Sequence, residues 1–130
     1  MLPQGSSRSR RPVFLNLFKI RFPVPALVSI AHRVSGALLV IAILPAVALL
    51  ALSLSGPEGF DRAAQWMASW PARLLGLLLA WSLVHHLLAG IRFLLLDMEW
   101  GIERRTARLS AGIVLAAGVV LGLVMWGGML

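Results

Sequence analysis

The sequence predicts an all-α membrane protein with three transmembrane helices. Hydrophobic residues make up 59% of its 130 residues and charged residues only 13%, which is too apolar for an ordinary soluble domain. Three long runs without a charged residue alternate with polar segments, and each run is long enough to cross a bilayer. Cysteine is absent, which excludes disulfides and thiol-ligated iron–sulfur clusters within this chain and leaves histidine and methionine as the softer metal ligands.

Residues 1–25 form a basic arm that we expect on the cytoplasmic side of the membrane. The run Ser9–Leu15 resembles a twin-arginine export signal, but Asn16, Lys19 and Arg21 interrupt the apolar core that such a signal requires. A cytoplasmic arm is therefore the favoured interpretation. Its charged residues are all positive: Arg8, Arg10, Arg11, Lys19 and Arg21.

Residues 26–130 are expected to form one three-helix transmembrane domain. The first helix covers about 26–53, because Pro23 and Pro25 are tolerated only before or within a first turn and Val34–Pro57 carries no charge. Pro45 lies inside this helix and can kink it, which neighbouring membrane helices accommodate. The turn-rich segment Ser53–Gly59 ends it.

The rest of the chain predicts two further spans. A short interfacial helix over Phe60–Met67 precedes them, with Trp66 and Trp70 at the level of the headgroups. The second span covers about 68–96, a polar loop follows over 97–108, and the third span covers about 107–129. Glycine and alanine in the third span provide small-residue faces for helix packing; they are Gly112, Gly118, Gly122, Ala111, Ala116 and Ala117.

The distribution of positive charge predicts the orientation of these spans. The basic arm and the 97–108 loop carry most of the lysine and arginine, whereas the 53–73 connection carries only Arg62 and Arg73. The positive-inside rule then places the N-terminus in the cytoplasm, or in a mitochondrial matrix, and the C-terminus outside. Because the positive residues flank apolar runs, the net charge of +7 indicates membrane lipid and not nucleic acid as a partner.

Two consecutive histidines, His85 and His86, stand inside the second span. Ionisable groups at membrane depth are costly and are candidates for function. Gly90 follows His86 by four residues on the same helical face, where a missing side chain lets a flat macrocycle approach, so a haem axial ligand is plausible. Arg92 then lies nearer the membrane surface, where it can pair with haem carboxylates.

Helical spacing alone leaves two alternatives open at this place. Arg92 is seven residues from His85 and shares its face, so only the Gly90 argument favours His86 as the ligand. Alternatively, one or both imidazoles hydrogen-bond across helices and bind no metal.

Ser29 and Arg33 form a second candidate site at the start of the first span. They are four residues apart and offer a hydroxyl donor and a fixed positive charge to the carbonyl oxygens of a quinone. In the alternative interpretation Arg33 reaches lipid phosphates and Ser29 caps the helix.

Taken together, several motifs resemble the cytochrome b subunit of succinate dehydrogenase, the larger membrane anchor of respiratory complex II. The resemblance covers about residues 12–128 and rests most on the His-Arg-x-Ser-Gly and His-x-x-x-Gly-x-Arg signatures. The matching segments are Ile20–Pro23, Ser29–Gly36, Ser55–Phe60 and His86–Arg92 with Asp97.

The resemblance implies a role for each matching residue. His86 is the haem b axial ligand, and the smaller anchor subunit supplies the second ligand. Ser29 and Arg33 contribute to the ubiquinone site, while His32 lies near the haem propionates. The family often has a second histidine where this chain has Phe93, which leaves the propionate contacts to His32, Arg92 or the partner. His85 receives no role.

The resemblance also implies partners and location. Electrons from succinate reach the quinone through a flavoprotein subunit and an iron–sulfur subunit, so this chain is not an enzyme by itself. The expected location is the bacterial inner membrane. Two alternatives remain at this point: a fumarate reductase anchor that uses menaquinol, and a membrane scaffold subunit without redox function.

Overall fold

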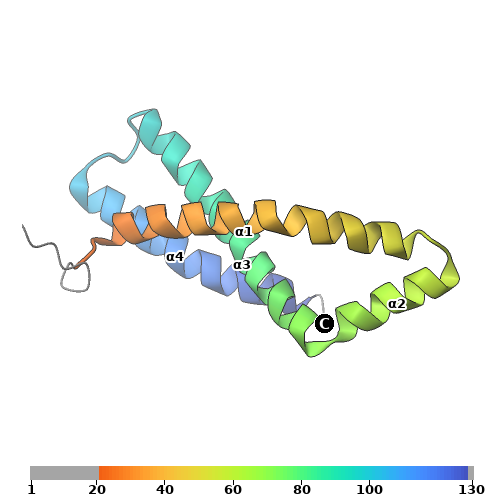
Figure 1. Cartoon of the computed structure of the whole chain (residues 1–130). Coiled ribbons are helices and arrows are strands. Elements are labelled where there is room, and N and C mark those ends of the chain that lie inside the picture. The colour runs from red at the N-terminus through yellow and green to blue at the C-terminus, as the bar shows by residue number, and fades with distance from the viewer. Residues whose placement is uncertain (1–20, 129–130) are drawn as a thin grey trace, which may run out of the picture.

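The structure is a computed structural model that describes residues 21–128. Over this range it contains helices α1 (Val24–Ser53), α2 (Pro57–Ala68), α3 (Trp70–Asp97) and α4 (Arg104–Gly127), and no strand (Figure 1). Helices α1, α3 and α4 are long and apolar enough to cross a membrane, which confirms the predicted all-α fold with three possible spans. Residues 1–20 of the expected basic arm lie outside the described residues.

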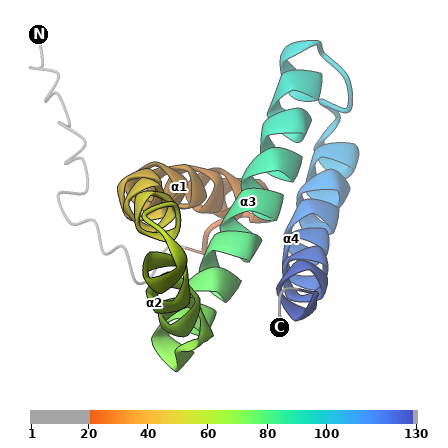
Figure 2. The ribbon, with the colours of Figure 1, turned by 90° about the vertical axis from the view of Figure 1, so that its right-hand side faces the viewer.

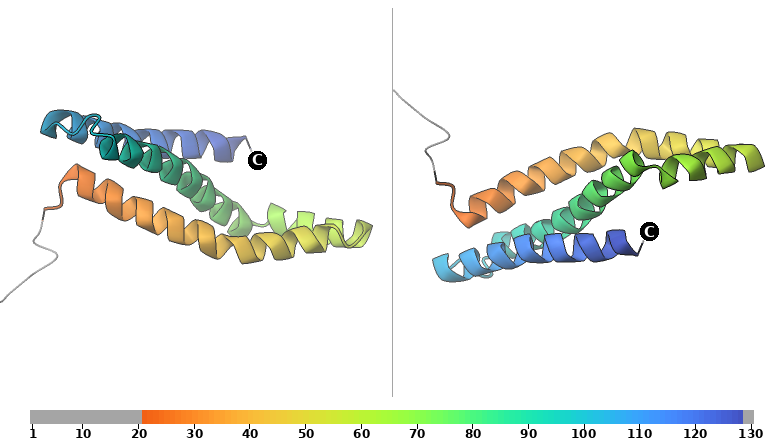
Figure 3. Two further views of the ribbon diagram at one scale, coloured as in Figure 1. Left: turned by 90° about the horizontal axis from the view of Figure 1, so that it is seen from above. Right: turned by 90° about the horizontal axis from the view of Figure 1, so that it is seen from below.

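Helix α3 is the central element of the molecule. Helices α1 and α2 lie on one side of it and α4 lies on the other (Figure 2). The start of α1, the end of α3 and the start of α4 lie at the same end of the molecule (Figures 1 and 3). The three long helices therefore run in alternating directions, as successive crossings of one bilayer require.

Proline residues define both the start and the shape of α1. The helix begins at Val24, slightly before the predicted residue 26, because Pro23 serves as its N-cap and Pro25 fits the first turn, where no N–H is needed. Pro45 removes one backbone donor inside the helix. The axis of α1 changes direction in its second half (Figure 3), as a proline in this position explains.

Helix α2 is longer than the predicted interfacial helix over Phe60–Met67. Gly56, with a φ of 119°, turns the chain, and Pro57 starts the helix. A single residue, Ser69, separates α2 from α3, and its hydroxyl accepts a hydrogen bond of 3.4 Å from the Ala72 N–H. The predicted start of the second span at residue 68 therefore falls on the last residue of α2.

The polar connection before α4 is shorter than the predicted 97–108 loop. It covers 98–103 and turns at Glu99 and Gly101, which both have positive φ values of 63° and 74°. Helix α4 begins at Arg104 instead of near residue 107, so Arg105 and Arg108 are helical. Arginine is a good helix former, and its long side chain reaches water from the end of a span.

The buried core lies between α3 and its two long neighbours and consists of small side chains. Its centre holds Val28 from α1, Ala89 from α3, and Ala111 and Val114 from α4. Most large apolar side chains point outward instead, including Leu44, which is 79% exposed. An outward apolar surface of this extent is expected where lipid or another membrane helix is the neighbour.

Candidate functional site

The consecutive histidines of α3 point to different helices. His86 faces α1, where an added Cβ on Gly36 would lie 2.7 Å from its Cε1 atom. His85 faces α4, where an added Cβ on Gly118 would lie 3.0 Å from its Nδ1 atom. Neighbouring residues of an α-helix differ by about 100° in direction, which explains this division. The α1 side of α3 therefore holds one imidazole and the α4 side holds the other.

The hydrogen bonds of His86 fix its tautomer. Its Nδ1 atom lies 3.0 Å from the carbonyl oxygen of His32, and a carbonyl only accepts, so Nδ1–H is the donor. Ser35 donates to the same carbonyl at 2.9 Å, and its Oγ lies 3.3 Å from His86 Nδ1. The proton on Nδ1 leaves the lone pair of Nε2 available, which is the arrangement that metal-binding imidazoles use.

Two other rings complete the surroundings of His86. The imidazole of His32 stacks on that of His86 with a centroid distance of 4.1 Å and an interplanar angle of 8°. Phe93 meets His32 edge-on, with centroids 5.2 Å apart and an angle of 65°. A metal approaches an imidazole nitrogen in the ring plane, so a ring stacked on the face of His86 leaves Nε2 accessible to a metal.

Two glycines allow the helices to approach each other at this place. Gly36 gives the His86 ring a place against the backbone of α1 that any side chain would fill. Gly90 lies beside His32, because a Cβ added there would be 3.6 Å from His32 Nε2. The structure thus places the His32 imidazole beside Gly90, where an open shelf under His86 was expected.

Arg92 joins α3 to the start of α4. Its Nε donates to Ser110 Oγ at 3.0 Å and its Nη2 donates to the Ala107 carbonyl at 2.9 Å. The side chain is only 6% exposed, and its guanidinium lies 5.6 Å from the centroid of the Phe93 ring. Arg92 therefore has a structural contact that the sequence did not predict, next to the His32–Phe93 pair.

Ser29 and Arg33 lie on α1 near the same end of the molecule. Ser29 is half-buried and Arg33 is exposed. Among the described residues, neither side chain makes a hydrogen bond or ion pair with another one, so the hydroxyl and the guanidinium are both available to a ligand. Their spacing of one helical turn puts them on one face of α1.

Helix α3 carries two buried polar residues without partners among the described residues. His85 and Ser82 are both 0% exposed, and within 21–128 the atoms His85 Nδ1, His85 Nε2 and Ser82 Oγ have no hydrogen-bond partner. Trp81 stacks on His85 with a centroid distance of 5.3 Å and an interplanar angle of 16°. His85 thus packs inside the α3–α4 contact and is closed to any group outside the chain.

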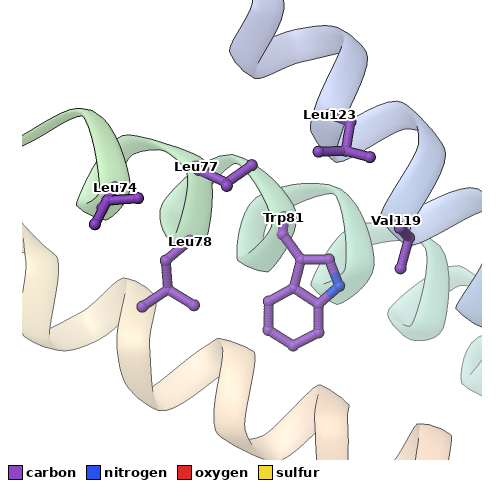
Figure 4. A pocket seen from close by; sticks show the side chains of 6 residues that line it. All are labelled: Leu74, Leu77, Leu78, Trp81, Val119 and Leu123. Atoms are coloured by element: carbon purple, nitrogen blue, oxygen red, sulfur yellow. The ribbon is translucent and has the colours of Figure 1, made fainter. Parts of the chain in front are cut away.

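The α3–α4 contact continues from His85 toward the end of α4. A Cβ added to Gly122 would lie 2.9 Å from the Trp81 Cα, so the two backbones touch here. The Trp81 indole lies in an open apolar groove of about 290 Å³ (Figure 4). The other residues that line the groove are Leu74, Leu77, Leu78, Val119 and Leu123.

Sequence reasoning identified the histidines of this site but missed the residues that orient them. Ser35 and Gly36 belong to the Ser29–Gly36 segment that carried the resemblance, yet they received no role. The sequence feature that could have identified them is their small size, one helical turn after His32, which favours close approach of another helix. Their pairing with His86 depends on helix register, which spacing within one helix does not reveal.

Fold and site together define a three-span membrane subunit with stacked imidazoles where two helices meet. The model of the succinate dehydrogenase/fumarate reductase transmembrane subunit family matches residues 7–125, and the chain belongs to this family. It is 32% identical over 118 residues to the succinate dehydrogenase cytochrome b556 subunit of Paracoccus denitrificans, a match that covers 91% of each chain. It is also 32% identical over 124 residues to the subunit of the same name from Coxiella burnetii, covering 91% of this chain and 98% of the relative. The expected resemblance to the cytochrome b subunit of complex II is confirmed.

Proposed function

We propose that this chain is the haem b membrane anchor of a succinate:ubiquinone oxidoreductase. Its family and the names of its relatives support the class of complex. The observation that carries the proposal is the His86 imidazole, whose Nδ1–H donates to the His32 carbonyl and whose Nε2 is left as a ligand atom.

His86 would hold the haem iron through Nε2, and the bound haem b supplies a one-electron carrier within the membrane. His85 is enclosed by α4 and is not available as a second ligand. As the resemblance to the cytochrome b subunit of complex II implies, the second ligand would come from another subunit. We assign it to a second hydrophobic anchor subunit that packs beside the α1–α3 contact.

His32 and Arg92 would lie near the haem carboxylates, and Gly90 would let the macrocycle approach the helix backbone. His32 is held by its stack on His86 and by the edge of Phe93. Arg92 uses Nε and Nη2 for α4, which leaves Nη1 for a carboxylate. Gly90 adds no side chain of its own, and the His32 ring lies beside it. Phe93 replaces the histidine that relatives often have, so it contributes ring packing in place of a propionate hydrogen bond.

Ser29 and Arg33 would form part of the quinone site. The Ser29 hydroxyl donates to one quinone carbonyl, and the Arg33 guanidinium stabilises the negative charge that develops on a quinone oxygen during reduction. Neither residue performs the reaction alone, because electrons come from succinate through separate flavoprotein and iron–sulfur subunits. The chain therefore acts as a non-catalytic subunit that attaches those subunits to the bacterial inner membrane, with its N-terminus in the cytoplasm.

The experiment that tests this function is purification of the whole complex through a tag on this chain. We expect the flavoprotein, the iron–sulfur subunit and a second anchor to copurify, with a b-type absorption spectrum that sharpens on addition of dithionite. We also expect succinate-dependent reduction of ubiquinone. A complex that copurifies but shows no haem spectrum would support the scaffold alternative instead.

A fumarate reductase anchor is the second candidate, because the matching family includes such subunits. The two proposed functions share the helices and the haem ligand. They are distinguished by the quinone, which is ubiquinone for one and menaquinol for the other. If the purified complex oxidises menaquinol with fumarate much faster than it reduces ubiquinone with succinate, the fumarate reductase assignment is correct.

A further inference from the structure

A basic surface lies at the start of α4, apart from the histidines. Arg104, Arg105 and Arg108 are all exposed and lie within the first two turns of a helix that can cross the membrane. With Leu109 they line an open hollow of about 490 Å³. This end of a membrane-spanning helix is at the level of lipid headgroups, whichever way the chain is oriented.

The three guanidinium groups have no acidic partner among the described residues. Glu99 and Glu103 are near in sequence, yet over 21–128 the structure shows one ion pair, between Arg62 and Glu58 at the opposite end. No side chain caps the first N–H groups of α4, so the positive end of the helix dipole adds to the arginine charge. The hollow therefore favours an anion.

Apolar and small residues continue directly below the arginines along α4. One row of residues four apart runs from Arg105 through Leu109 to Ile113, and the last two are 59% and 67% exposed. The adjacent row runs from Arg108 to Gly112 and Ala116. A Cβ added to Gly112 would meet no atom within 4 Å and Ala116 is exposed, so this row is an open strip of small residues, which we call the channel. The positive charge stands at the start of α4, and the strip of small residues follows it along the helix. This arrangement fits one molecule that has a negatively charged headgroup and an acyl chain.

We propose that this surface binds an anionic phospholipid. The headgroup phosphate lies among Arg104, Arg105 and Arg108, and one acyl chain lies along the Arg108–Gly112–Ala116 row. A zwitterionic lipid fits less well, because its own cation offsets the phosphate charge among three unpaired guanidinium groups. An acidic protein surface also fits less well, because the channel below the arginines faces the hydrocarbon region.

The test uses the whole complex in phosphatidylcholine nanodiscs that contain a trace of spin-labelled lipid. Electron paramagnetic resonance measures the fraction of label held immobile by the protein, with phosphatidylglycerol and phosphatidylcholine compared. We expect a clear preference for phosphatidylglycerol in the wild type. The variant R104Q/R105Q/R108Q should lose it, by up to about fivefold in relative affinity for each arginine removed.

Matched variants separate this site from a general charge effect. R62Q/R73Q removes two arginines at the other end of the span and should keep the preference. Single R105Q and R108Q variants should show smaller losses in the same direction. They keep the test valid if the triple variant does not fold. Gly112→Phe keeps every charge, fills the channel and should also reduce the preference. An unchanged preference in Gly112→Phe would overturn the acyl-chain position.

Three results would overturn the proposal itself. The first is equal immobilisation of phosphatidylglycerol by the wild type and the triple variant. The second is complete displacement of the lipid by inorganic phosphate, which would indicate a site for free phosphate. The third is loss of the soluble subunits from the triple variant with an unchanged lipid preference, which would indicate a docking site for protein.

Discussion

At the scale of single residues, the site depends on which way two adjacent imidazoles point. His86 lies against Gly36 and donates to the His32 carbonyl, whereas His85 is enclosed beside Gly118 with no hydrogen-bond partner. Both are histidines at membrane depth, but only His86 has one nitrogen bonded and one nitrogen available. The hydrogen bond of Nδ1 therefore decides which of the two is a ligand candidate.

Gly36 gives the first prediction at this scale. Gly36→Ala places a Cβ 2.7 Å from His86 Cε1, so the imidazole must move. Disturbing a group that orients a metal ligand costs about 10- to 100-fold in metal affinity. We expect the variant complex to lose at least about tenfold in haem affinity, measured by haem titration of the apo-complex. Gly127→Ala, where an added Cβ meets nothing within 4 Å, is the control and should bind haem normally.

Arg33 gives the second prediction. Replacing it with glutamine removes a charge-assisted hydrogen bond of about 1.5–3 kcal/mol, so ubiquinone reduction should fall by roughly 10- to 100-fold. Succinate oxidation with an artificial soluble acceptor should persist, since that reaction does not use this chain. Parallel assays of the two activities check this, with Arg73→Gln at the far end as the control. An equal fall in both activities would remove Arg33 from the quinone site.

The sequence indicated candidate site residues but not the contacts that hold them. His86, His32, Ser29 and Arg33 became candidates because ionisable and hydroxyl groups stand out in an apolar helix, and their roles stay predictions. The contacts of Arg92 with Ser110 and Ala107 were missed, because they join two helices across a turn. The relative rotation of helices depends on packing, and packing is not visible in the spacing along one helix.

At the scale of elements, α3 is a helix with two different packing faces. One face carries His86, Gly90 and Phe93 toward α1, and the other carries Trp81 and His85 toward α4. The two glycines of α4 that meet this second face, Gly118 and Gly122, are four residues apart. They hold α4 close to α3 by contact of backbone with side chain, which is how small residues stabilise helix pairs in lipid.

Gly122 gives the prediction for this scale. In Gly122→Leu the Cβ alone would lie 2.9 Å from the Trp81 Cα, so α4 must move away from α3. Overpacking of this kind costs about 1–3 kcal/mol. We expect a lower midpoint temperature of the complex in a detergent thermal-shift assay. Gly127→Leu on the same helix adds the same side chain in open space, and an equal fall for both variants would contradict a close α3–α4 contact at Gly122.

The positions of the long helices were predicted better than the residues at which the helices begin and end. The uncharged runs located all three long helices, because a span without charge is a strong signal. The start of α4 at Arg104 was missed, since a basic segment was read as loop although arginine forms helix well. The boundary between α2 and α3 was not predicted correctly, because the single residue Ser69 ends α2 and caps α3.

At the scale of the whole molecule, the chain has the properties of one part of a larger membrane assembly. Its core is made of small residues, and most of its large apolar side chains point outward. The class of fold followed from composition and charge alone. The names of the family and of its relatives support a complex with other subunits, and a second haem ligand supplied by one of them stays a prediction.

The most direct test of this account is the reduced-minus-oxidised absorption spectrum of the complex that carries His86→Ala. We predict that the b-type bands are lost or strongly diminished while the subunits still copurify. The matched variant His85→Leu, one residue away and buried against α4, should keep them. A spectrum of normal intensity in His86→Ala, or loss of the bands only in His85→Leu, would contradict the assignment of His86 as the haem ligand.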